Sequence, residues 1–198
     1  MSPADALDAE RLRAAVSGQL IGHELLLLPQ TTSTNEVVAQ MAAEHREGLV
    51  VIAEEQSAGR GQYGRRWESA AGQGLWMSVL LRPRLAVAQS AQLTDLLART
   101  IAEQIGSSAS IKPPNDVYLG GRKVAGVLVE MKVEPNGSYC AVAGMGINVN
   151  QTAEDFPPEL RETATSLALS FEQPIDRTRF AIELLRRLEA NYHAFTTR

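Results

Sequence analysis

Two long runs rich in apolar and β-branched residues, 124–133 and 139–149, constrain the fold more than any other feature of this 198-residue sequence. They are separated by Pro135-Asn136-Gly137, a group of residues that favours a tight turn. Shorter runs before them are separated by two further turn-forming pairs, Asn115-Asp116 and Gly120-Gly121. Strands joined by short turns pair with their neighbours in the chain, so the second half of the sequence predicts an antiparallel meander.

Helical periodicity is present on both sides of this region. Apolar residues recur on one face from Leu93 to Ile105, and Gly106 follows as a typical helix end. Near the C-terminus, Asp176 is a suitable N-cap for an amphipathic helix whose apolar face extends to Tyr192. We therefore predict a helix before the meander and a second helix after it.

The first half of the chain combines helices and strands. One helix is predicted between Ser2-Pro3-Ala4-Asp5 and Gly18, and another from the capping residues 31–35 towards Gly48. Short apolar runs predict strands at Leu25–Leu28, Leu49–Ala53 and Leu75–Leu81. Because these elements do not alternate strictly as βαβ units, the sequence favours a single α+β domain, residues 1–198, with a mixed, largely antiparallel sheet packed against helices.

Composition narrows the range of partners and locations. The 19 basic and 23 acidic residues give a formal charge of −4, which provides no overall positive field for nucleic acid or for a membrane surface. The single cysteine, Cys140, excludes an intramolecular disulfide, and the three histidines lie too far apart for a local metal motif. The first residues resemble neither a signal peptide nor a membrane helix. We therefore expect a cytoplasmic protein with no nucleic-acid partner and no membrane partner.

The most informative segment is 56–67, which contains three glycines and three arginines next to an aromatic residue. Glycines allow backbone amides to approach a ligand closely, and arginines supply forked, charged donors that fit a carboxylate or phosphate. The glycine spacing differs from that of a Walker loop and from a dinucleotide-binding motif. The segment predicts an anion-binding loop, and a solvated loop without a ligand is the alternative.

A lysine held by two prolines forms the second candidate, Ile111-Lys112-Pro113-Pro114-Asn115-Asp116. Rigid flanking residues suit a positioned charge, so Lys112 is predicted to contact a phosphate or carboxylate oxygen. Asp116 is either a magnesium ligand or a turn former, because Asn-Asp is also an ordinary turn pair. Taken alone, this segment favours the turn.

Two further segments place unusual residues inside apolar strands. Residues 122–130 include Lys123 and Gly126, although a lysine at a sheet edge is often only a device for solubility. Residues 144–150 alternate glycine with larger residues. That alternation indicates either a ligand pressed against the backbone or tight packing between strands.

In this order and spacing, the segments resemble the catalytic core of the biotin protein ligases, also called biotin-[acetyl-CoA-carboxylase] ligases, over about residues 31–150. The matching segments are Ser33-Thr34-Asn35 for the family's STN, Gly59 to Trp67 for its glycine-arginine loop, Lys112 to Asp116 for its KWPND, Arg122 to Glu130 for its RKLAGILVE and Gly144 to Asn150 for its GIGINVN. The resemblance implies the class II synthetase-like fold of biotin/lipoate ligase catalytic domains.

The resemblance also implies a reaction. A biotin carboxylate attacks the α-phosphate of ATP, pyrophosphate leaves, and biotinyl-5′-AMP then acylates a lysine of a biotin carboxyl carrier protein of the acetyl-CoA carboxylase type. ATP and Mg²⁺ are the implied cofactors, biotin is the substrate, and a homodimer is compatible with the resemblance. Lys112 is the expected principal catalytic residue, Arg60 and Arg65 stabilise negative charge, and Asp116 is the expected magnesium ligand.

Binding roles are carried over from the family residue by residue. The expected biotin-binding residues are Ser33, Thr34, Asn35, Gln56, Gly59, Arg60, Gly61, Gln62, Lys112, Gly126, Gly144 and Gly146. The expected ATP- or adenylate-binding residues are Arg60, Arg65, Trp67, Lys112, Asn115, Lys123 and Asn148. Structural roles remain open for three of them: Ser33 as a helix cap, Trp67 as a core residue and Asn148 as a β-bulge residue.

The sequence departs from the family pattern in three respects. Pro113 replaces a tryptophan, which removes an aromatic wall and is expected to weaken biotin affinity. Gln62 and Tyr63 replace basic residues that are frequent in the loop, so the adenylate is expected to be held less tightly. We also expect a core without the family's C-terminal β-barrel domain of roughly 50 residues and without a helix-turn-helix domain, hence no operator binding.

Three alternative functions remain at this point. One is a nucleotide-binding protein with unrelated chemistry, which ATP-dependent activity without biotin would reveal. A lipoate or octanoate ligase of the same superfamily also activates a carboxylate, but it lacks the GRGxxGRxW loop. A non-catalytic biotin sensor, or a split ligase that requires a partner chain, would retain the biotin pocket. The presence of Arg60, Arg65, Lys112 and Asp116 disfavours the sensor, because a simple biotin binder does not need an α-phosphate site.

Overall fold

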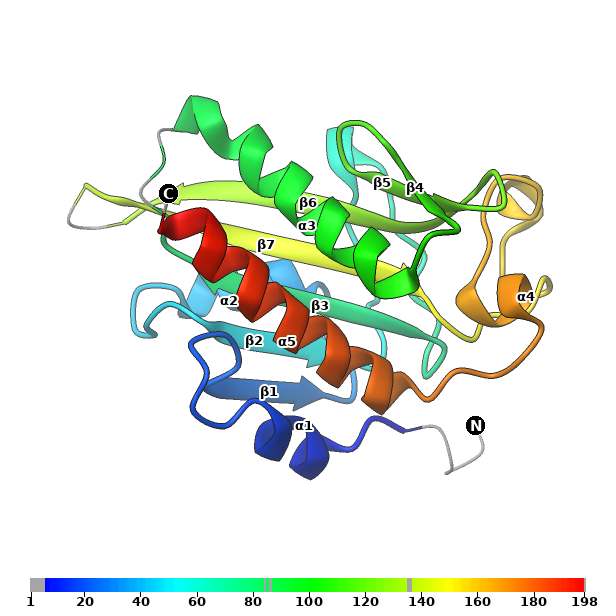
Figure 1. Cartoon of the computed structure of the whole chain (residues 1–198), viewed down its shortest axis with the longest axis horizontal. Coiled ribbons are helices and arrows are strands. Elements are labelled where there is room, and N and C mark those ends of the chain that lie inside the picture. The colour runs from blue at the N-terminus through cyan, green and yellow to red at the C-terminus, as the bar shows by residue number, and fades with distance from the viewer. Residues whose placement is uncertain (1–5, 84, 86, 135–136, 198) are drawn as a thin grey trace.

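The computed structural model describes residues 6–83, 85, 87–134 and 137–197, and it contains a seven-stranded sheet with helices on both faces (Figure 1). The strands are β1 (Glu24–Leu28), β2 (Leu49–Ala53), β3 (Gly74–Leu81), β4 (Ala109–Lys112), β5 (Asp116–Leu119), β6 (Arg122–Val133) and β7 (Tyr139–Asn148). The helices are α1 (Ala9–Ala15), α2 (Thr34–Met41), α3 (Ser90–Ile105), α4 (Leu167–Phe171) and α5 (Arg177–Thr196).

The sheet has the order β1-β2-β3-β7-β6-β5-β4. Only β1 and β2 run parallel, as the crossover through α2 requires, and every other neighbouring pair is antiparallel. The predicted meander is therefore confirmed for β4 to β7. Gly120 and Gly121 connect β5 to β6 with φ values of 57° and 77°, the conformation that a two-residue hairpin turn needs and that glycine adopts without strain. The prediction of a mixed, largely antiparallel α+β fold is confirmed.

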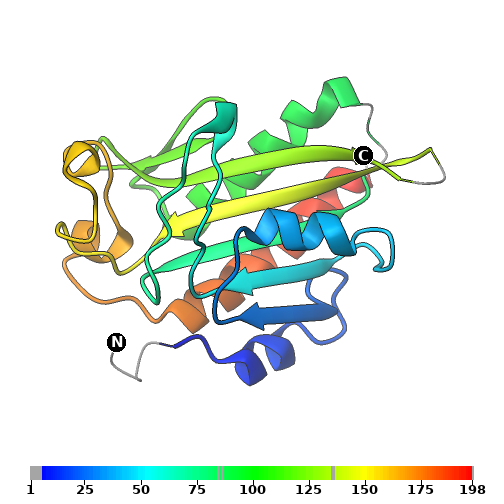
Figure 2. The same cartoon turned by 180° about the vertical axis from the view of Figure 1, so that it is seen from behind.

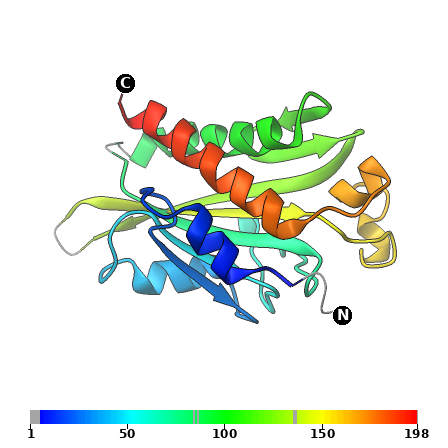
Figure 3. The same cartoon turned by 60° about the horizontal axis from the view of Figure 1, so that its bottom comes forward.

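Alternation along the strands divides the core between the two faces of the sheet. Val50 and Ile52 of β2 point towards the core under α1, α3 and α5, whereas Leu49 and Val51 point towards α2. Figure 3 shows α3 and α5 on one side of the sheet and α2 on the other. The α2 side of the sheet carries a smaller apolar cluster. Residues 54–74 cross the same side of the sheet next to α2 (Figure 2). This less covered face is where a ligand can reach the strands.

Helix α5 is fastened to the sheet at both ends. Near its start, Arg177 is almost fully buried and forms an ion pair of 2.8 Å with Glu54, directly after β2. Near its end, the Tyr192 hydroxyl donates a hydrogen bond to Glu47, shortly before β2. Burial and this hydrogen bond raise the pKa of Tyr192 above its ordinary range. The two contacts anchor α5 across the strand from which the arginine-rich loop departs.

Several predicted boundaries differ from the structure. The predicted start at Ser2-Pro3-Ala4-Asp5 lies outside the described residues, and α1 begins after Asp8, whose side chain accepts from the Arg11 amide. Helix α2 ends at Met41 rather than near Gly48, and Arg82 donates to the carbonyl of Ala42 just beyond it.

The two strongest helix predictions are confirmed. Gly106 ends α3, and the Asp176 side chain caps α5 by accepting from the amide of Arg179. Helix α4 was not predicted. No helix in the described part of the chain has the length and apolar character needed to cross a membrane.

Candidate functional site

A cavity of about 320 Å³ lies on the α2 side of the sheet. Its floor is formed by β6 and β7, and its walls by the start of α2, the arginine-rich loop and residues 156–164. Among the predicted site residues, those that line it are Ser33, Thr34, Asn35, Gln56, Arg60, Gly61, Gln62, Arg65, Trp67, Asn115, Asp116, Lys123, Gly126, Gly144, Gly146 and Asn148. Two predicted residues, Gly59 and Lys112, are not among the described residues that line it.

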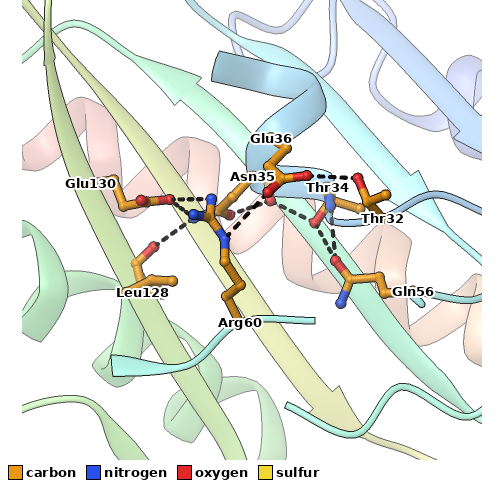
Figure 4. Close-up of polar contacts among 9 residues, drawn as sticks. Thr32, Thr34, Asn35, Glu36, Gln56, Arg60, Leu128 and Glu130 are labelled. Carbon is orange, nitrogen blue, oxygen red and sulfur yellow. Dashed lines mark hydrogen bonds and ion pairs between the residues drawn. The ribbon is translucent and has the colours of Figure 1, made fainter. Parts of the chain in front are cut away.

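The start of α2 contributes a buried polar corner (Figure 4). Thr34 donates its backbone amide to Gln56 Oε1 at 2.8 Å, and its hydroxyl lies 2.7 Å from the hydroxyl of Ser78. Ser78 in turn donates to Asn35 Oδ1 at 2.6 Å. Ser33 is the N-cap by position, but its side chain makes no capping hydrogen bond, so the cap alone does not account for this buried hydroxyl.

Arg60 crosses from the loop to the sheet at the edge of this corner (Figure 4). Its Nη2 atom lies 3.1 Å from Glu130 Oε2, which also accepts from Asn35 Nδ2 at 2.8 Å. The Arg60 Nε atom is 4.0 Å from Glu36 Oε1. The guanidinium is therefore held beside the polar corner, with 41% of its side chain still exposed.

Trp67 lies over the glycines of the cavity floor. A Cβ atom at Gly146 would be 2.6 Å from the indole, and one at Gly126 would be 2.9 Å from it. The indole also meets Trp76 edge to face at 6.5 Å, and the ammonium of Lys123 lies 5.1 Å from its centre. The two glycines thus make space for an aromatic ring, and their prediction as ligand contacts is tested only by a bound ligand.

Gly144 has the same role for Asn35. A Cβ atom at this position would lie 2.2 Å from Asn35 Oδ1, closer than any real contact. The glycines on β6 and β7 thus permit close packing of side chains that themselves line the cavity, and a ligand pressed against the backbone stays a prediction.

The two predicted site lysines occupy different positions. Lys123 lines the cavity and forms an ion pair of 2.6 Å with Asp116. Lys112 is exposed at the end of β4, and its ammonium lies 5.4 Å from the ring of Tyr118, which does line the cavity. In this structure Lys123 is the lysine next to the cavity and Lys112 is at its periphery.

Two predicted amides are held by the backbone. Asn115 donates to the carbonyl of Val127 at 3.0 Å and so joins the β4–β5 turn to β6. Asn148 donates to the carbonyl of Thr165 at 3.0 Å and accepts from Gln151 at 3.1 Å. Each residue therefore positions part of the wall as well as lining it.

Gly59 and Arg65 shape the loop. A Cβ atom at buried Gly59 would lie 2.4 Å from the carbonyl of Trp67, so glycine is needed where the loop folds back on itself. The carbonyl of Arg65 accepts from the Gly61 amide at 2.7 Å, while the Arg65 side chain is exposed at the cavity. Exposed Tyr63 stands at the tip with a φ of 59°.

Sequence reasoning did not identify Ser78, Glu130 or the wall formed by residues 156–164. Ser78 is fully buried in β3 between apolar residues, and an isolated polar residue in such a strand is a usable signal. Glu130 interrupts an apolar strand in the same way. Residues 156–164 carry no pattern that links them to the site, because they reach it only through the tertiary fold.

The arrangement suits a ligand with a small polar head, an apolar body and an anionic end. Amide and hydroxyl groups meet at the start of α2, and Trp67 with the glycine backbone provides an apolar surface. The arginines and Lys123 supply positive charge. Placed together in a partly enclosed cavity, these cations would stabilise negative charge that develops during a reaction.

Known proteins resemble the chain over most of its length. Residues 27–148 match the biotin/lipoate A/B protein ligase family. The bifunctional ligase/repressor BirA of Bacillus spizizenii is 35% identical over 196 residues, which cover 96% of this chain and 60% of that protein. The biotin-[acetyl-CoA-carboxylase] ligase of Mycobacterium tuberculosis is 37% identical over 205 residues, which cover 92% and 73%.

A solved structure of a biotin protein ligase has a similar fold. The biotin protein ligase from Aquifex aeolicus in complex with biotin and ATP superposes with a TM-score of 0.76 at 31% sequence identity. The match covers 88% of this chain and 72% of that chain.

Proposed function

Because the chain belongs to the biotin/lipoate A/B protein ligase family, we propose that it activates biotin with ATP to biotinyl-5′-AMP and transfers biotin to a lysine of a biotin carboxyl carrier protein. The chain spans 60% of the length of the Bacillus relative, so the complete reaction and its acceptor are part of this proposal. We propose a cytoplasmic location for the protein because its proposed substrate is ATP.

One observation carries the proposal: four of the five sequence segments that resemble biotin ligases meet in one cavity, and the fifth contributes Asn115 and Asp116 to its wall. The M. tuberculosis and Aquifex relatives, which carry biotin ligase names, support biotin over lipoate or octanoate as the acid. We assign the polar corner of Thr34, Asn35 and Gln56 to the ureido ring of biotin.

In the first step, the biotin carboxylate oxygen forms a bond to the α-phosphorus of ATP, and the bond to the pyrophosphate oxygen breaks. Two anions must approach each other, so cations at the reacting centre stabilise the transition state. Arg60, Arg65 and Lys112 are the proposed cations, and Lys123 is the proposed contact to the adenylate. In the second step, the acceptor amine attacks the carbonyl carbon and AMP leaves.

Mg²⁺ is proposed to enter with ATP rather than to occupy a resident site. Within the described residues, no group of three or more His, Cys, Asp or Glu side chains is arranged to hold a metal ion. A nucleotide-bound Mg²⁺ needs only one or two carboxylates, because phosphates and waters complete its shell. Asp116 fits that role if its ion pair with Lys123 opens when the nucleotide binds.

Two partners are proposed for the chain. The first is the carrier protein. The second is another copy of the chain, because β1 and β4 are the outer strands of the sheet.

The test is exchange of labelled pyrophosphate into ATP by the purified chain with biotin, lipoate, octanoate or no acid. We expect exchange with biotin alone. Biotin binding without exchange would instead support the sensor or the split ligase, and exchange with lipoate or octanoate would support the other ligase.

The same assay separates the two lysines. Lys112→Ala and Lys123→Ala are each expected to reduce exchange about 100-fold or more, the usual cost of removing a group that stabilises developing charge. Lys132→Ala is the matched control, because Lys132 is an exposed lysine of β6 that does not line this cavity. Unchanged exchange in Lys112→Ala would move the principal role to Lys123.

A further inference from the structure

Glu130 joins the polar corner to the arginine-rich loop, although its own side chain is not among the described groups that line the cavity. One oxygen, Oε2, accepts from Asn35 Nδ2 at 2.8 Å and from Arg60 Nη2 at 3.1 Å (Figure 4). We propose that Glu130 is a positioning residue that fixes the Asn35 amide and the Arg60 guanidinium for the ligand. This inference rests on the proposed function, since it concerns the same biotin site.

The charge of Glu130 determines the orientation of the Asn35 amide. A carboxylate only accepts hydrogen bonds, so the nitrogen of the amide must face it. The amide oxygen then faces Ser78, which donates to it at 2.6 Å. The reversed amide would place oxygen against oxygen at Glu130. Glu130 and the carbonyl of Leu128, which accepts from the same nitrogen at 3.5 Å, select this orientation. The Ser78 hydroxyl can donate or accept, so its direction follows that of the amide.

This orientation continues along the hydroxyl groups. Ser78 has a single proton, which is given to Asn35, so at 2.7 Å its oxygen accepts from the hydroxyl of Thr34. The one proton of Thr34 is then shared with Gln56 Oε1, which lies 3.1 Å from the same hydroxyl. Gln56 Oε1 accepts from the Thr34 backbone amide, and Gln56 Nε2 donates to Ser69 Oγ at 2.9 Å. The carboxylate of Glu130, outside the cavity wall, therefore sets the direction of the hydrogen bonds from Asn35 to Thr34, whereas the Thr34 backbone amide sets that of Gln56.

Glu130 has a second effect through Arg60. The Arg60 side chain is 41% exposed, and its described partners are Glu130 at 3.1 Å and the more distant Glu36 at 4.0 Å. Without the Glu130 carboxylate, this long side chain would sample many rotamers, and ordering it on a ligand would cost conformational entropy. A single acid therefore connects the neutral end of the site with its anion-binding end.

The experiment measures the dissociation constant of biotin, without ATP, by isothermal titration calorimetry. Glu130→Leu should weaken biotin binding about 10- to 100-fold, the range for loss of a hydrogen-bonded charge. Glu130→Gln keeps an accepting oxygen and the same shape, so it should weaken biotin binding clearly less than Glu130→Leu does. Glu134→Gln is the matched control, because Glu134 follows the same strand and pairs with Arg82 at 2.6 Å away from the cavity. Its dissociation constant should equal that of the unaltered chain.

Kinetics and coupling distinguish positioning from a general loss of structure. Glu130→Leu should raise KM for biotin, because Asn35 is no longer positioned, and lower kcat, because Arg60 is no longer positioned, while its melting temperature stays near that of Glu134→Gln. Ser78→Ala should weaken biotin binding through the same amide. In the double variant Ser78→Ala/Glu130→Leu, the fold-increase in the biotin dissociation constant should be smaller than the product of the two single fold-increases, because both residues act on Asn35.

The outcomes separate this inference from the proposed function. If the unaltered chain binds biotin and folded Glu130→Gln and Glu130→Leu bind it equally well, the positioning role is overturned and the proposed function stands. Strictly multiplicative effects of Ser78→Ala and Glu130→Leu would also overturn it. If the unaltered chain binds no biotin, the proposed function fails and this inference fails with it.

Discussion

At the scale of single residues, glycines decide which side chains reach the cavity floor. Gly144 allows the Asn35 amide to lie directly against β7, and Gly126 and Gly146 allow the Trp67 ring to lie against both central strands. These contacts depend on the missing Cβ and not on unusual backbone angles. The glycine pattern is thus a requirement of packing that also shapes a ligand site.

Gly144→Ala should disable the site while leaving the fold intact. The new methyl group would lie 2.2 Å from Asn35 Oδ1, so the amide must move away from Ser78 and Glu130. A displacement of this size is expected to lower kcat/KM for biotin about 100-fold in the pyrophosphate exchange assay. Ala143→Gly is the control on the same strand, because its side chain faces the other core. It should lower stability by about 1 kcal/mol and leave kcat/KM unchanged; equal kcat/KM in both variants would contradict this role of Gly144.

The sequence allowed most residues around the cavity to be predicted, because they belong to short segments with unusual composition. Ser33 to Asn35 and the arginine-rich loop are examples. Ser78 and Glu130 could not be assigned roles, since their importance comes from pairing with residues about 40 to 95 positions away. The peripheral position of Lys112 is likewise a property of the β4–β5 turn in three dimensions.

At the scale of elements, the loop of residues 54–74 has a hydrogen-bonded base and an exposed tip. Its base is closed by a hydrogen bond from the Gly72 amide to the Glu54 carbonyl, and Glu54 is held by buried Arg177. Its tip contains exposed arginines and exposed Tyr63. A loop with a fixed base and an exposed tip can close over a reactive adenylate and exclude water.

Ligands should therefore protect this loop from trypsin. Cleavage after Arg60, Arg65 and Arg66 is expected to slow when biotin and ATP are present, as followed by mass spectrometry of the peptides. Arg46 is the internal control, because it is exposed in the turn after α2 and does not line the cavity. Equal cleavage rates of the loop with and without ligands would argue against closure.

Elements with strong local signals were predicted well, and elements defined by tertiary contacts were not. The Gly106 end of α3 and the Asp176 cap of α5 are local features, and both are confirmed. Helix α4 has only five residues and was missed, although its Ser166 side chain caps it by accepting from the Leu169 amide. A helix this short depends on packing more than on intrinsic propensity.

At the scale of the whole molecule, α5 acts as a brace across the sheet. Its contacts with Glu47 and Glu54 lie on either side of β2, so it stabilises the strand that leads into the loop (Figure 1). The overall α+β class followed from the sequence, because strand and helix patterns are local. The strand order did not, because it depends on which face of the sheet each helix covers.

The buried contact between Tyr192 and Glu47 predicts that the stability of the fold depends on pH. The pKa of Tyr192 is raised by burial and by its hydrogen bond to Glu47, whereas an unfolded tyrosine ionises near pH 10. The stabilisation is therefore complete below pH 10 and is lost as pH rises towards the pKa of the folded state. Above pH 10, this residue should lower the free energy of unfolding by about 1.4 kcal/mol per pH unit.

Urea unfolding at pH 8 to 11 tests this prediction against Tyr192→Phe. The variant should be less stable at pH 8, because it lacks the hydrogen bond, and should decline less steeply above pH 10. Parallel declines for the two proteins would show that Tyr192 does not contribute.

In the proposed reaction this cavity joins biotin to AMP, and the identity of the product shows whether it does. The purified chain is incubated with biotin and MgATP in the absence of an acceptor, quenched, and analysed by mass spectrometry. The expected products are biotinyl-5′-AMP and pyrophosphate. Turnover of ATP without the biotinyl adenylate, or no turnover by a chain that binds both ligands, would contradict the proposed reaction.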